Sequence, residues 1–222
     1  MDVILIPWRG GDTSRERNLH FVLDWYRGMN LPVTLADADS DKPFNRGASR
    51  NAAAQIAGDW DTALVADADC VADPNVIWEA FRVARETGTM VLPHDDFWRL
   101  SERGTHRLIA DPDHYRAHPG DILDLSMGTR LQQSMMPSGA LVITRASFEA
   151  IGGYADIPFW GFEDSLLLIE AKEAVGVTRL PGYLWHLWHP RTTGTIDDRT
   201  QAREIADRHL ADRRASRLAA RE

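Results

Sequence analysis

The stretch Asp61-Thr-Ala-Leu-Val-Ala-Asp67-Ala-Asp69-Cys-Val is the most informative feature of this chain, because a short apolar run, typical of a buried strand, ends in two carboxylates that one residue separates. In a strand, residues i and i+2 point to the same side, so Asp67 and Asp69 can face one ion or its water shell. Ligands of α/β sheets bind beyond the carboxyl ends of strands, and hard oxygen donors suit Mg²⁺ or Mn²⁺. The stretch predicts a divalent-cation site at a sheet edge; a chance Asp-x-Asp turn in an acidic chain is the alternative.

Composition restricts the class of protein. The chain has 222 residues and a net charge of -8, which argues against a polyanion as the main partner. Its lone Cys70 excludes an intramolecular disulfide and fits a reducing compartment, and we interpret it as an inert thiol at a strand end. The opening apolar run at 3–6 is too short for a secretory signal, and no run approaches the ~20 residues of a membrane span. We therefore expect a cytoplasmic protein.

Short apolar runs alternate with helical patterns, which is typical of a mostly parallel α/β sheet flanked by helices. Asp73 is the expected N-cap of one helix and Pro74 its first residue. We expect strands at 3–8, 32–36, 62–66, 89–92, 139–144, 177–180 and 183–187, and helices at 14–27, 47–57, 74–86, 145–151 and 163–175.

Two segments depart from this alternation. The periodicity fails over 94–137, where Asp, His, Gly and Pro are frequent, and such irregular inserts are often functional loops. From Asp197 onward an Arg/Ala/Asp-rich helix is expected, whose charges form a solvated face; contact with nucleic acid is the less favoured alternative. The expected organisation is a single domain over 1–195, with an irregular insert at 94–137, followed by a charged helix over 196–222.

Four local patterns follow one another along the chain. They are Ile4-Leu-Ile-Pro7-Trp8-Arg9, Phe44-Asn45-Arg46, Asp67-Ala68-Asp69 and Phe159-Trp160-Gly161-Phe162-Glu163-Asp164. Their order resembles the glycosyltransferases of the GT-A fold (Rossmann-like), above all the β-1,4-galactosyltransferase group and its relatives in family 2, over about 3–191 apart from the insert. The resemblance implies metal-dependent transfer of a sugar from a nucleotide-diphosphate donor, expected to be UDP-linked, to an acceptor hydroxyl with inversion.

The resemblance also implies a set of donor contacts. Arg9 matches the family's Pro-x-Arg, Phe44 its base-stacking aromatic and Arg46 its phosphate ligand, and guanidinium groups pair well with phosphate oxygens. Asp37 ends a strand where such enzymes place a carboxylate on the base or ribose; a polar turn explains it equally well. The implied donor site comprises Pro7, Arg9, Arg15, Asp37, Phe44, Arg46, Asp67, Ala68, Gly139 and Trp160.

For the metal, the family uses the last Asp of its Asp-x-Asp and a distant His. This implies Asp69 as direct ligand, with Asp67 as a water-mediated or ribose-contacting neighbour. Within 183–191, His189 fits the family's His-x-Arg better than His186 does, because Arg191 follows it by two residues. Taken alone, a histidine in this aromatic segment is more often structural. Mixed oxygen and imidazole donors favour Mn²⁺ over Mg²⁺.

The last pattern resembles the family's acceptor and catalytic loop. It implies Asp164 as general base, Glu163 as an acceptor or donor-sugar contact, and Trp160 as a platform for an apolar sugar face. From the residues alone, complementing the dipole of the helix that follows is an equal alternative for the two acids, and packing in a core is the alternative for Trp160. The chain lacks the extra glycines that precede the acidic pair in the galactosyltransferases.

Other classes remain open. A phage-type transferase that modifies hydroxymethylated DNA bases is the alternative within the enzyme reading, so nucleic acid enters only as an acceptor. A sugar-nucleotide nucleotidyltransferase should open with a Gly-rich phosphate loop, and Gly10-Gly11 is too little. A metal-dependent hydrolase would need more clustered ligands, and a non-catalytic binder would lose the carboxylates.

Overall fold

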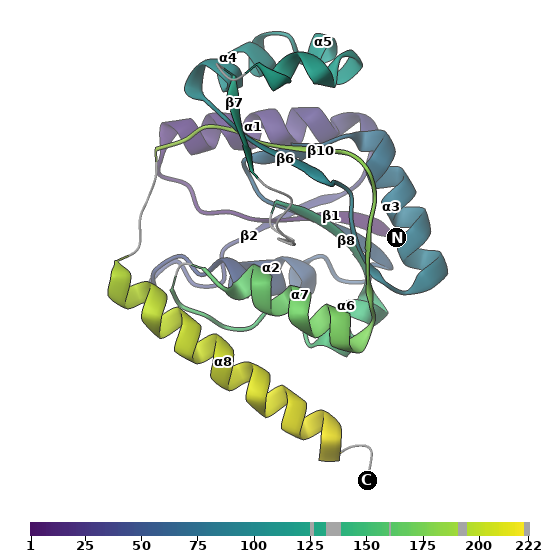
Figure 1. Ribbon diagram of the computed structural model, residues 1–222, viewed down its shortest axis with the longest axis vertical. Helices are drawn as coiled ribbons and strands as arrows, with labels where there is room; N and C mark the ends of the chain where they lie inside the picture. Colours follow the sequence, from purple (N-terminus) through teal and green to yellow (C-terminus); the bar gives the residue numbers. More distant parts are fainter. Residues whose placement is uncertain (125–126, 132–138, 160, 191–194, 220–222) are drawn as a thin grey trace.

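A computed structural model describes residues 1–124, 127–131, 139–159, 161–190 and 195–219 (Figure 1). Its main sheet has the strand order β2-β1-β3-β8-β5-β9. Strand β1 pairs in parallel with β2 and β3, β5 pairs in parallel with β9, and β8 runs antiparallel to both of its neighbours. The strands are β1 (Asp2–Pro7), β2 (Val33–Ala36), β3 (Thr62–Ala66), β5 (Met90–Leu92), β8 (Ala140–Thr144) and β9 (Val177–Arg179).

Helices cover both faces of this sheet (Figure 1). Along β1, Ile4 and Ile6 pack with residues of α1 and α3, whereas Val3 and Leu5 pack with residues of α2, α6 and α7. Burial on both sides explains why these strands are continuous apolar runs rather than alternating ones. The helices are α1 (Thr13–Tyr26), the short 3₁₀ helix η1 (Arg27–Met29), α2 (Arg46–Ile56), α3 (Pro74–Thr87), α6 (Arg145–Ile151) and α7 (Glu163–Ala174).

A second, smaller sheet has the order β4-β10-β6-β7. Its Trp185 is fully buried and meets Trp25 of α1 edge to face, with ring centroids 5.9 Å apart. This contact joins the small sheet to the α1 side of the main core. The strands are β4 (Cys70–Ala72), β6 (Asp96–Leu100), β7 (Gly128–Leu131) and β10 (Tyr183–His186).

The expectation of an irregular insert at 94–137 is wrong for most of that segment. Strand β6 is followed by α4 (Glu102–Ala110), α5 (Pro112–Ala117), the 3₁₀ helix η2 (Pro119–Leu123) and strand β7. The polar residues that hide these elements in the sequence are caps: Ser101 accepts from Gly104 N and Asp111 from His114 N. Leu108 and Ile122 are fully buried in the main core, so packing holds these short elements in place.

The C-terminal helix α8 (Ile196–Ala219) lies against α7 (Figure 1). Ala202 and Ala206 are buried in the contact, and Arg213 pairs with the fully buried Glu170 of α7. The predicted solvated face is therefore only the outer side of this helix. Among the described residues, no helix combines the length and the apolar character that crossing a membrane requires.

Candidate active site

The two aspartates of the opening stretch form a turn that carries the chain from one sheet to the other. Cys70 N donates to the carbonyl of Asp67 at 3.2 Å, which closes the turn between β3 and β4. Asp67 N donates to Gly139 O at 2.9 Å, and Leu187 N donates to Asp69 O at 2.8 Å. These bonds place the pair at the carboxyl end of β3, between β8 and the end of β10.

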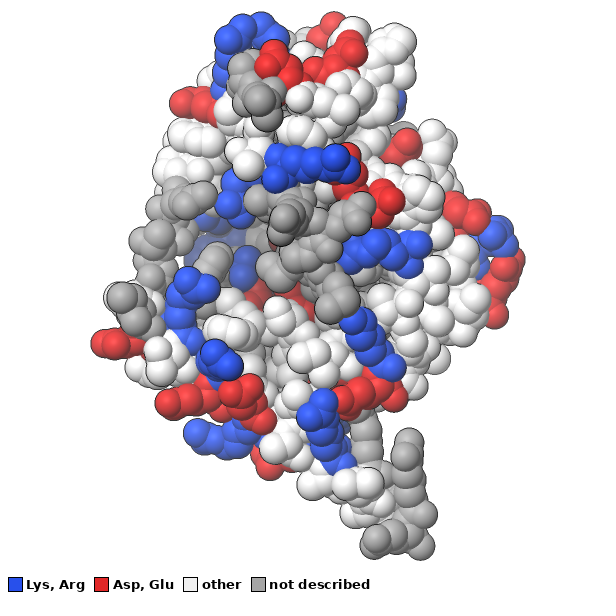
Figure 2. Space-filling view, viewed as in Figure 1, with Lys and Arg blue, Asp and Glu red and all other residues white. Residues whose placement is uncertain are grey.

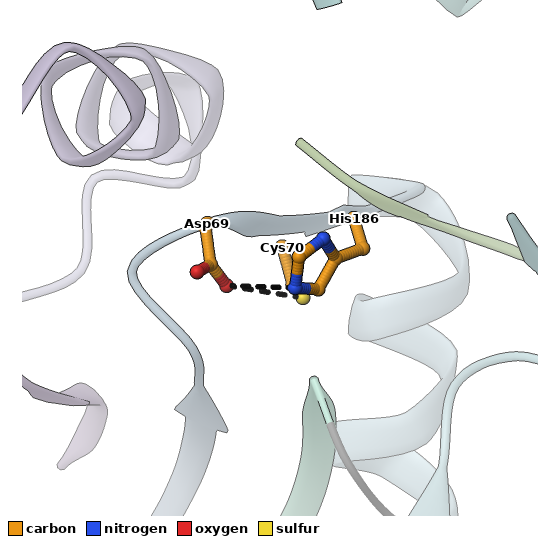
Figure 3. Close-up of side chains that lie close together, drawn as sticks. All are labelled: Asp69, Cys70 and His186. Carbon is orange, nitrogen blue, oxygen red and sulfur yellow. Dashed lines mark hydrogen bonds and ion pairs between the residues drawn. The ribbon is translucent and has the colours of Figure 1, made fainter. Parts of the chain in front are cut away.

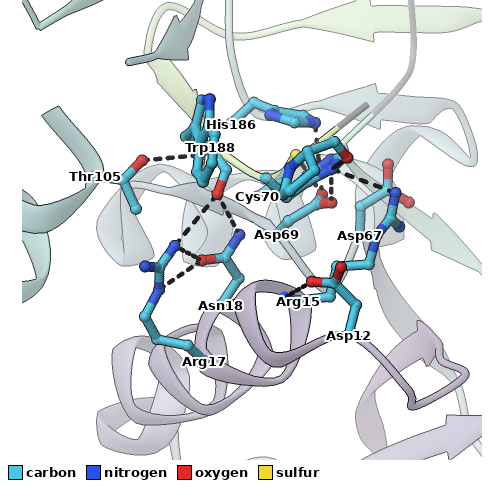
Figure 4. Close-up of polar contacts among 12 residues, drawn as sticks. Asp12, Arg15, Arg17, Asn18, Asp67, Asp69, Cys70, Thr105, His186 and Trp188 are labelled. Carbon is cyan, nitrogen blue, oxygen red and sulfur yellow. Dashed lines mark hydrogen bonds and ion pairs between the residues drawn. The ribbon is translucent and has the colours of Figure 1, made fainter. Parts of the chain in front are cut away.

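Two histidines flank the carboxylate of Asp69. His189 Nε2 lies 3.2 Å from Asp69 Oδ2, and His186 Nε2 lies 3.8 Å from Oδ1 (Figure 4). Burial opposes ionisation of Asp69, but the two histidines outweigh it and hold the pKa of Asp69 well below its usual range. The bond to Asp69 raises the pKa of His189, whereas burial lowers that of His186. The geometry brings the expected ligands Asp69 and His189 together and adds His186.

Cys70 lies beside this group without the character of a metal ligand. The ligand atoms of Asp69, Cys70 and His186 lie within 4.8 Å of one another (Figure 3). Burial raises the pKa of the Cys70 thiol well above its usual value, so it stays protonated. The donors left are a carboxylate and two imidazoles, and the buried Nδ1 of His186 has no hydrogen-bond partner among the described residues. This set suits a divalent cation such as Mn²⁺.

Arg15, near the start of α1, points toward the same centre. Its Nη2 lies 3.3 Å from His189 Nδ1, and its backbone N–H donates to the N-cap Asp12 (Figure 4). A phosphate contact at Arg15 would therefore lie beside the candidate metal residues. Arg17 turns away instead, toward Asn18 and the carbonyl of Trp188, where it supports the chain that carries His189.

Arg9, Asp37 and Phe44 form one cluster at the ends of β1 and β2, where Pro7 pairs with Ala36. Arg9 pairs with Asp37 through two nitrogens and lowers the pKa of Asp37, and its guanidinium lies 5.4 Å from the centroid of the Phe44 ring. Arg9 also donates to two backbone carbonyls of the 39–42 loop. Since protein groups occupy its donors, Arg9 shapes this loop.

A buried ion network joins the second pair of carboxylates to the first. Arg50 of α2 donates to Asp164 Oδ1 at 2.8 Å and also to Asp67 Oδ1. Arg46, one turn earlier on α2, forms an ion pair with Glu163. Sequence reasoning missed Arg50, although a second arginine four residues after Arg46 in a small-residue helix was a usable signal.

Glu163 retains free hydrogen-bonding capacity. Both of its carboxylate oxygens are buried and make no hydrogen bond to any described residue, despite the ion pair with Arg46. Burial and the neighbouring Asp164 raise the pKa of Glu163. Both acids stand in the first turn of α7, which is the position that the helix-dipole alternative requires. A residue that only complements the dipole need not be buried or paired with arginine, and both acids are, so the dipole alone does not explain them.

No protein-family model and no curated protein matches the sequence, but solved structures match the fold. Drosophila β1,4-galactosyltransferase 7 with manganese, UDP-Gal and xylobiose gives a TM-score of 0.59 at 15% identity, covering 91% of this chain and 79% of that one. The glucosyl-3-phosphoglycerate synthase of Mycobacterium tuberculosis with Mn²⁺, UDP-Glc and phosphoglyceric acid gives 0.53 at 12%, covering 95% and 78%. The mannosyl-3-phosphoglycerate synthase of Rubrobacter xylanophilus gives 0.53 at 15%, covering 96% and 73%.

This is the GT-A glycosyltransferase fold. The fold class predicted from the sequence is confirmed, and identities this low establish the fold alone. In this fold the Asp67–Asp69 turn contacts His186 at the end of β10, His189 after it and, through Arg50, the start of α7. The space-filling view shows one hollowed face of the molecule, with Lys and Arg side chains around the hollow (Figure 2).

Three further residues were predicted to line the donor site, and the structure describes the surroundings of two of them, Gly139 and Ala68. Gly139 has φ +95°, and an added Cβ would lie 2.5 Å from Leu184 Cδ2 and 3.1 Å from Cys70 Sγ, so close packing of β8 on the small sheet requires glycine there. Ala68, between the two aspartates, packs partly buried against the main core. Trp160 and Arg191 lie outside the described residues, as does the segment 132–138 that directly precedes Gly139.

Proposed function

We propose that this chain is a metal-dependent glycosyltransferase that moves a sugar from a UDP-linked donor to an acceptor hydroxyl. The observation that carries the proposal is the meeting of two carboxylate pairs, Asp67 with Asp69 and Glu163 with Asp164, in a GT-A frame. Solved structures of the same fold contain Mn²⁺ with UDP-Gal or UDP-Glc, which supports a metal and a uridine donor. For the acceptor we propose a carbohydrate or another small hydroxyl compound.

The charge of the site supports a divalent cation. Four carboxylates share it with the guanidinium groups of Arg15, Arg46 and Arg50, which leaves one negative charge when all of these groups are ionised and the histidines are neutral. Buried like charges are costly without a counter-ion. Asp69 and His189 would hold the cation, with Asp67 and His186 beside it. When bound, the cation would offset the negative charge that develops on the diphosphate leaving group.

The other donor contacts follow from the clusters already described. The Phe44 ring and Asp37, fixed by Arg9, would bind the nucleobase end of the donor. Arg15 and Arg46 would contact the diphosphate, because Arg15 lies beside His189 and Arg46 beside Glu163, and guanidinium groups pair well with phosphate oxygens. The two guanidiniums would stabilise the leaving group most strongly as its charge develops.

The chemical step we propose is a single displacement with inversion. Asp164 takes the proton of the acceptor hydroxyl while the acceptor oxygen bonds to the anomeric carbon and the bond from that carbon to the β-phosphate oxygen breaks. The bonding electrons leave with UDP. Glu163, whose oxygens are free of hydrogen bonds to the described residues, would orient a hydroxyl of the acceptor or of the donor sugar.

A thermal-shift series of nucleotide sugars with and without Mn²⁺ tests the proposal. Ligand that binds only the folded state stabilises it by about 2.7 kcal/mol at a hundredfold excess over Kd. We expect a large shift with a UDP-sugar only when Mn²⁺ is present. Asp69→Ala and His189→Ala should each abolish the metal-dependent part, because each removes a ligand, and His186→Ala should keep most of it.

Two outcomes would change this conclusion in different ways. If His186→Ala abolishes the metal-dependent shift and His189→Ala does not, the ligand assignment moves to His186 and the transferase proposal stands. If no nucleotide diphosphate or nucleotide sugar shifts the melting temperature with or without Mn²⁺, the transferase proposal is wrong.

A further inference from the structure

We propose that Arg50 is a positioning residue that fixes the base Asp164 relative to the donor-side carboxylate Asp67. The inference rests on the proposed function, because it assigns Arg50 a part in the same reaction. Arg50 would not touch the substrate; it would act through the two carboxylates that its guanidinium holds.

One planar group joins three elements that are distant in the sequence. Arg50 stands on α2, Asp67 directly follows β3 and Asp164 lies in the first turn of α7. Nη1 of Arg50 donates to Asp164 Oδ1 at 2.8 Å, and Nη2 donates to Asp67 Oδ1. Since the guanidinium is a rigid fork, its two bonds fix the distance and the relative orientation of the two carboxylates.

The surroundings of Arg50 hold this fork in one place. Its side chain is only 2% exposed, and its guanidinium carbon lies 4.8 Å from the centroid of the Tyr154 ring. The side chain of the next residue, Asn51, holds the main chain of Tyr154, and thereby the position from which the ring extends: it donates to Tyr154 O and accepts from Tyr154 N. Burial opposes the charge of Arg50, but Asp164 and Asp67 outweigh it and raise its pKa, so the cation persists.

The geometry also assigns the two oxygens of Asp164 different tasks. Arg50 occupies Oδ1, whereas no hydrogen bond from a described residue reaches Oδ2. The side chain of Asp164 is 10% exposed, and Oδ2 is the oxygen that the bond to Arg50 leaves available. The proton of the acceptor hydroxyl would therefore pass to Oδ2, with Asp164 turned toward the acceptor by its bond to Arg50.

Arg50→Lys tests this role with the charge retained. A lysine ammonium is a point charge and cannot hold both carboxylates in the same fixed geometry. Affinity for UDP with Mn²⁺ should stay within about threefold of wild type, because Arg50 does not contact the donor. Hydrolysis of UDP-galactose or UDP-glucose, and transfer where an acceptor is known, should fall about 10- to 100-fold in kcat, since small misplacement of a catalytic group has effects of this size.

A double variant separates positioning from a general structural effect. In an Asp164→Asn background, Arg50→Lys should lower kcat by less than about twofold, because residues that act as a unit are not additive. Arg213→Lys is the matched control: Arg213 also pairs with a buried carboxylate of α7, Glu170, but outside the site. It should leave kcat within about twofold of wild type.

The outcomes decide between the two proposals. Unchanged kcat in Arg50→Lys, a full additive loss in the double variant, or an equal loss in Arg213→Lys would each overturn the role of Arg50 while wild type remains active. If Arg50→Lys does not fold, Tyr154→Leu is the replacement variant. It removes the ring against which the guanidinium of Arg50 packs, so the orientation of Arg50 is less restricted, and it should lower kcat only when Asp164 is present. A wild-type protein that neither binds UDP with Mn²⁺ nor cleaves a UDP-sugar would overturn the proposed function, and this inference with it.

Discussion

Glu163 and Asp164 are neighbours in the sequence but have different partners in the fold. Arg50 holds Asp164 by a hydrogen bond, whereas Glu163 forms an ion pair with Arg46 and leaves its oxygens without hydrogen bonds to the described residues. A carboxylate held on one oxygen suits a proton acceptor in a fixed orientation. One with unused acceptors suits a hydroxyl ligand. The two residues should therefore respond differently to isosteric substitution.

Asp164→Asn should lower kcat by roughly 10²- to 10⁴-fold, the usual share of general base catalysis, with binding of UDP and Mn²⁺ retained. Glu163→Gln should mainly raise the KM for the acceptor or lower the affinity for the sugar of the donor, because it alters a contact that orients one of them. Turnover and UDP affinity of both variants check this. Near-normal turnover of Asp164→Asn would remove it from the mechanism.

At the residue scale, the sequence predicted what its local motifs encode. Asp67, Asp69, His189, Glu163 and Asp164 lie around one centre because short motifs end β3, follow β10 and start α7. Their roles stay predictions. Arg50 was missed because its partners lie 17 and 114 residues away; its spacing from Arg46 places both arginines on one face of the helix but does not identify those partners. The reason for glycine at position 139 likewise depends on contacts with β4 and β10.

At the scale of elements, α8 matters through its hold on α7, the helix that starts with the acidic pair. Glu170 of α7 is fully buried, and its carboxylate lies 3.3 Å from Arg213 Nε and 3.2 Å from His209 Nε2. Arg213 also donates to Ile151 O at the end of α6. A buried carboxylate is stable only with partners of this kind.

Arg213→Leu should destabilise the fold by about 2 kcal/mol, less than for a fully buried pair, because Arg213 is partly exposed and His209 remains. Urea unfolding measures this. Glu170→Gln in the same chain should restore part of the loss by removing the unpaired charge. Arg214→Leu, which breaks an exposed pair with Glu173, should leave the unfolding midpoint nearly unchanged. Equal losses in the Arg213 and Arg214 variants would contradict this account.

Elements with a local signal in the sequence were predictable, including short ones such as β5 and β9, and elements without such a signal were not. The sequence predicted β3, α6 and the capped start of α3 closely, because hydrophobic periodicity and the Asp73-Pro74 cap are local signals. It missed β4, which has three residues, and the elements between 96 and 131. Their stability comes from tertiary contacts such as those of Leu108 and Ile122, which no window of the sequence contains.

At the scale of the whole molecule, His94 makes the stability of the fold sensitive to acid. Its side chain is buried, and burial, with help from Arg179, lowers its pKa to about 3 against the partial opposition of Asp95. The unfolded chain then binds a proton below about pH 6.5 that the folded protein takes up only near pH 3. Stability from this group is therefore lost as the pH falls through that window.

His94→Phe should reduce this acid sensitivity by removing the titrating group while keeping an aromatic ring of similar size. We expect the free energy of unfolding of wild type to fall by a few kcal/mol more than that of the variant between about pH 6.5 and pH 4. Urea titrations at several pH values measure the difference. His20→Gln, at an exposed position on α1, is the control, and an equal slope for all three proteins would exclude His94 as the cause.

The Asp67–Asp69 turn is the three-residue connection that joins the main sheet to the small sheet, since β3 ends at Ala66 and β4 begins at Cys70. A gain or loss of one residue there would shift the pairing of β4 with β10 and turn Cys70 to the opposite face. It would also displace Asp69 from His186 at the end of β10 and from His189 after it. We therefore expect a one-residue insertion or deletion in this turn to be far more damaging than one in the loop between α4 and α5, which joins two short helices away from both sheets' pairing.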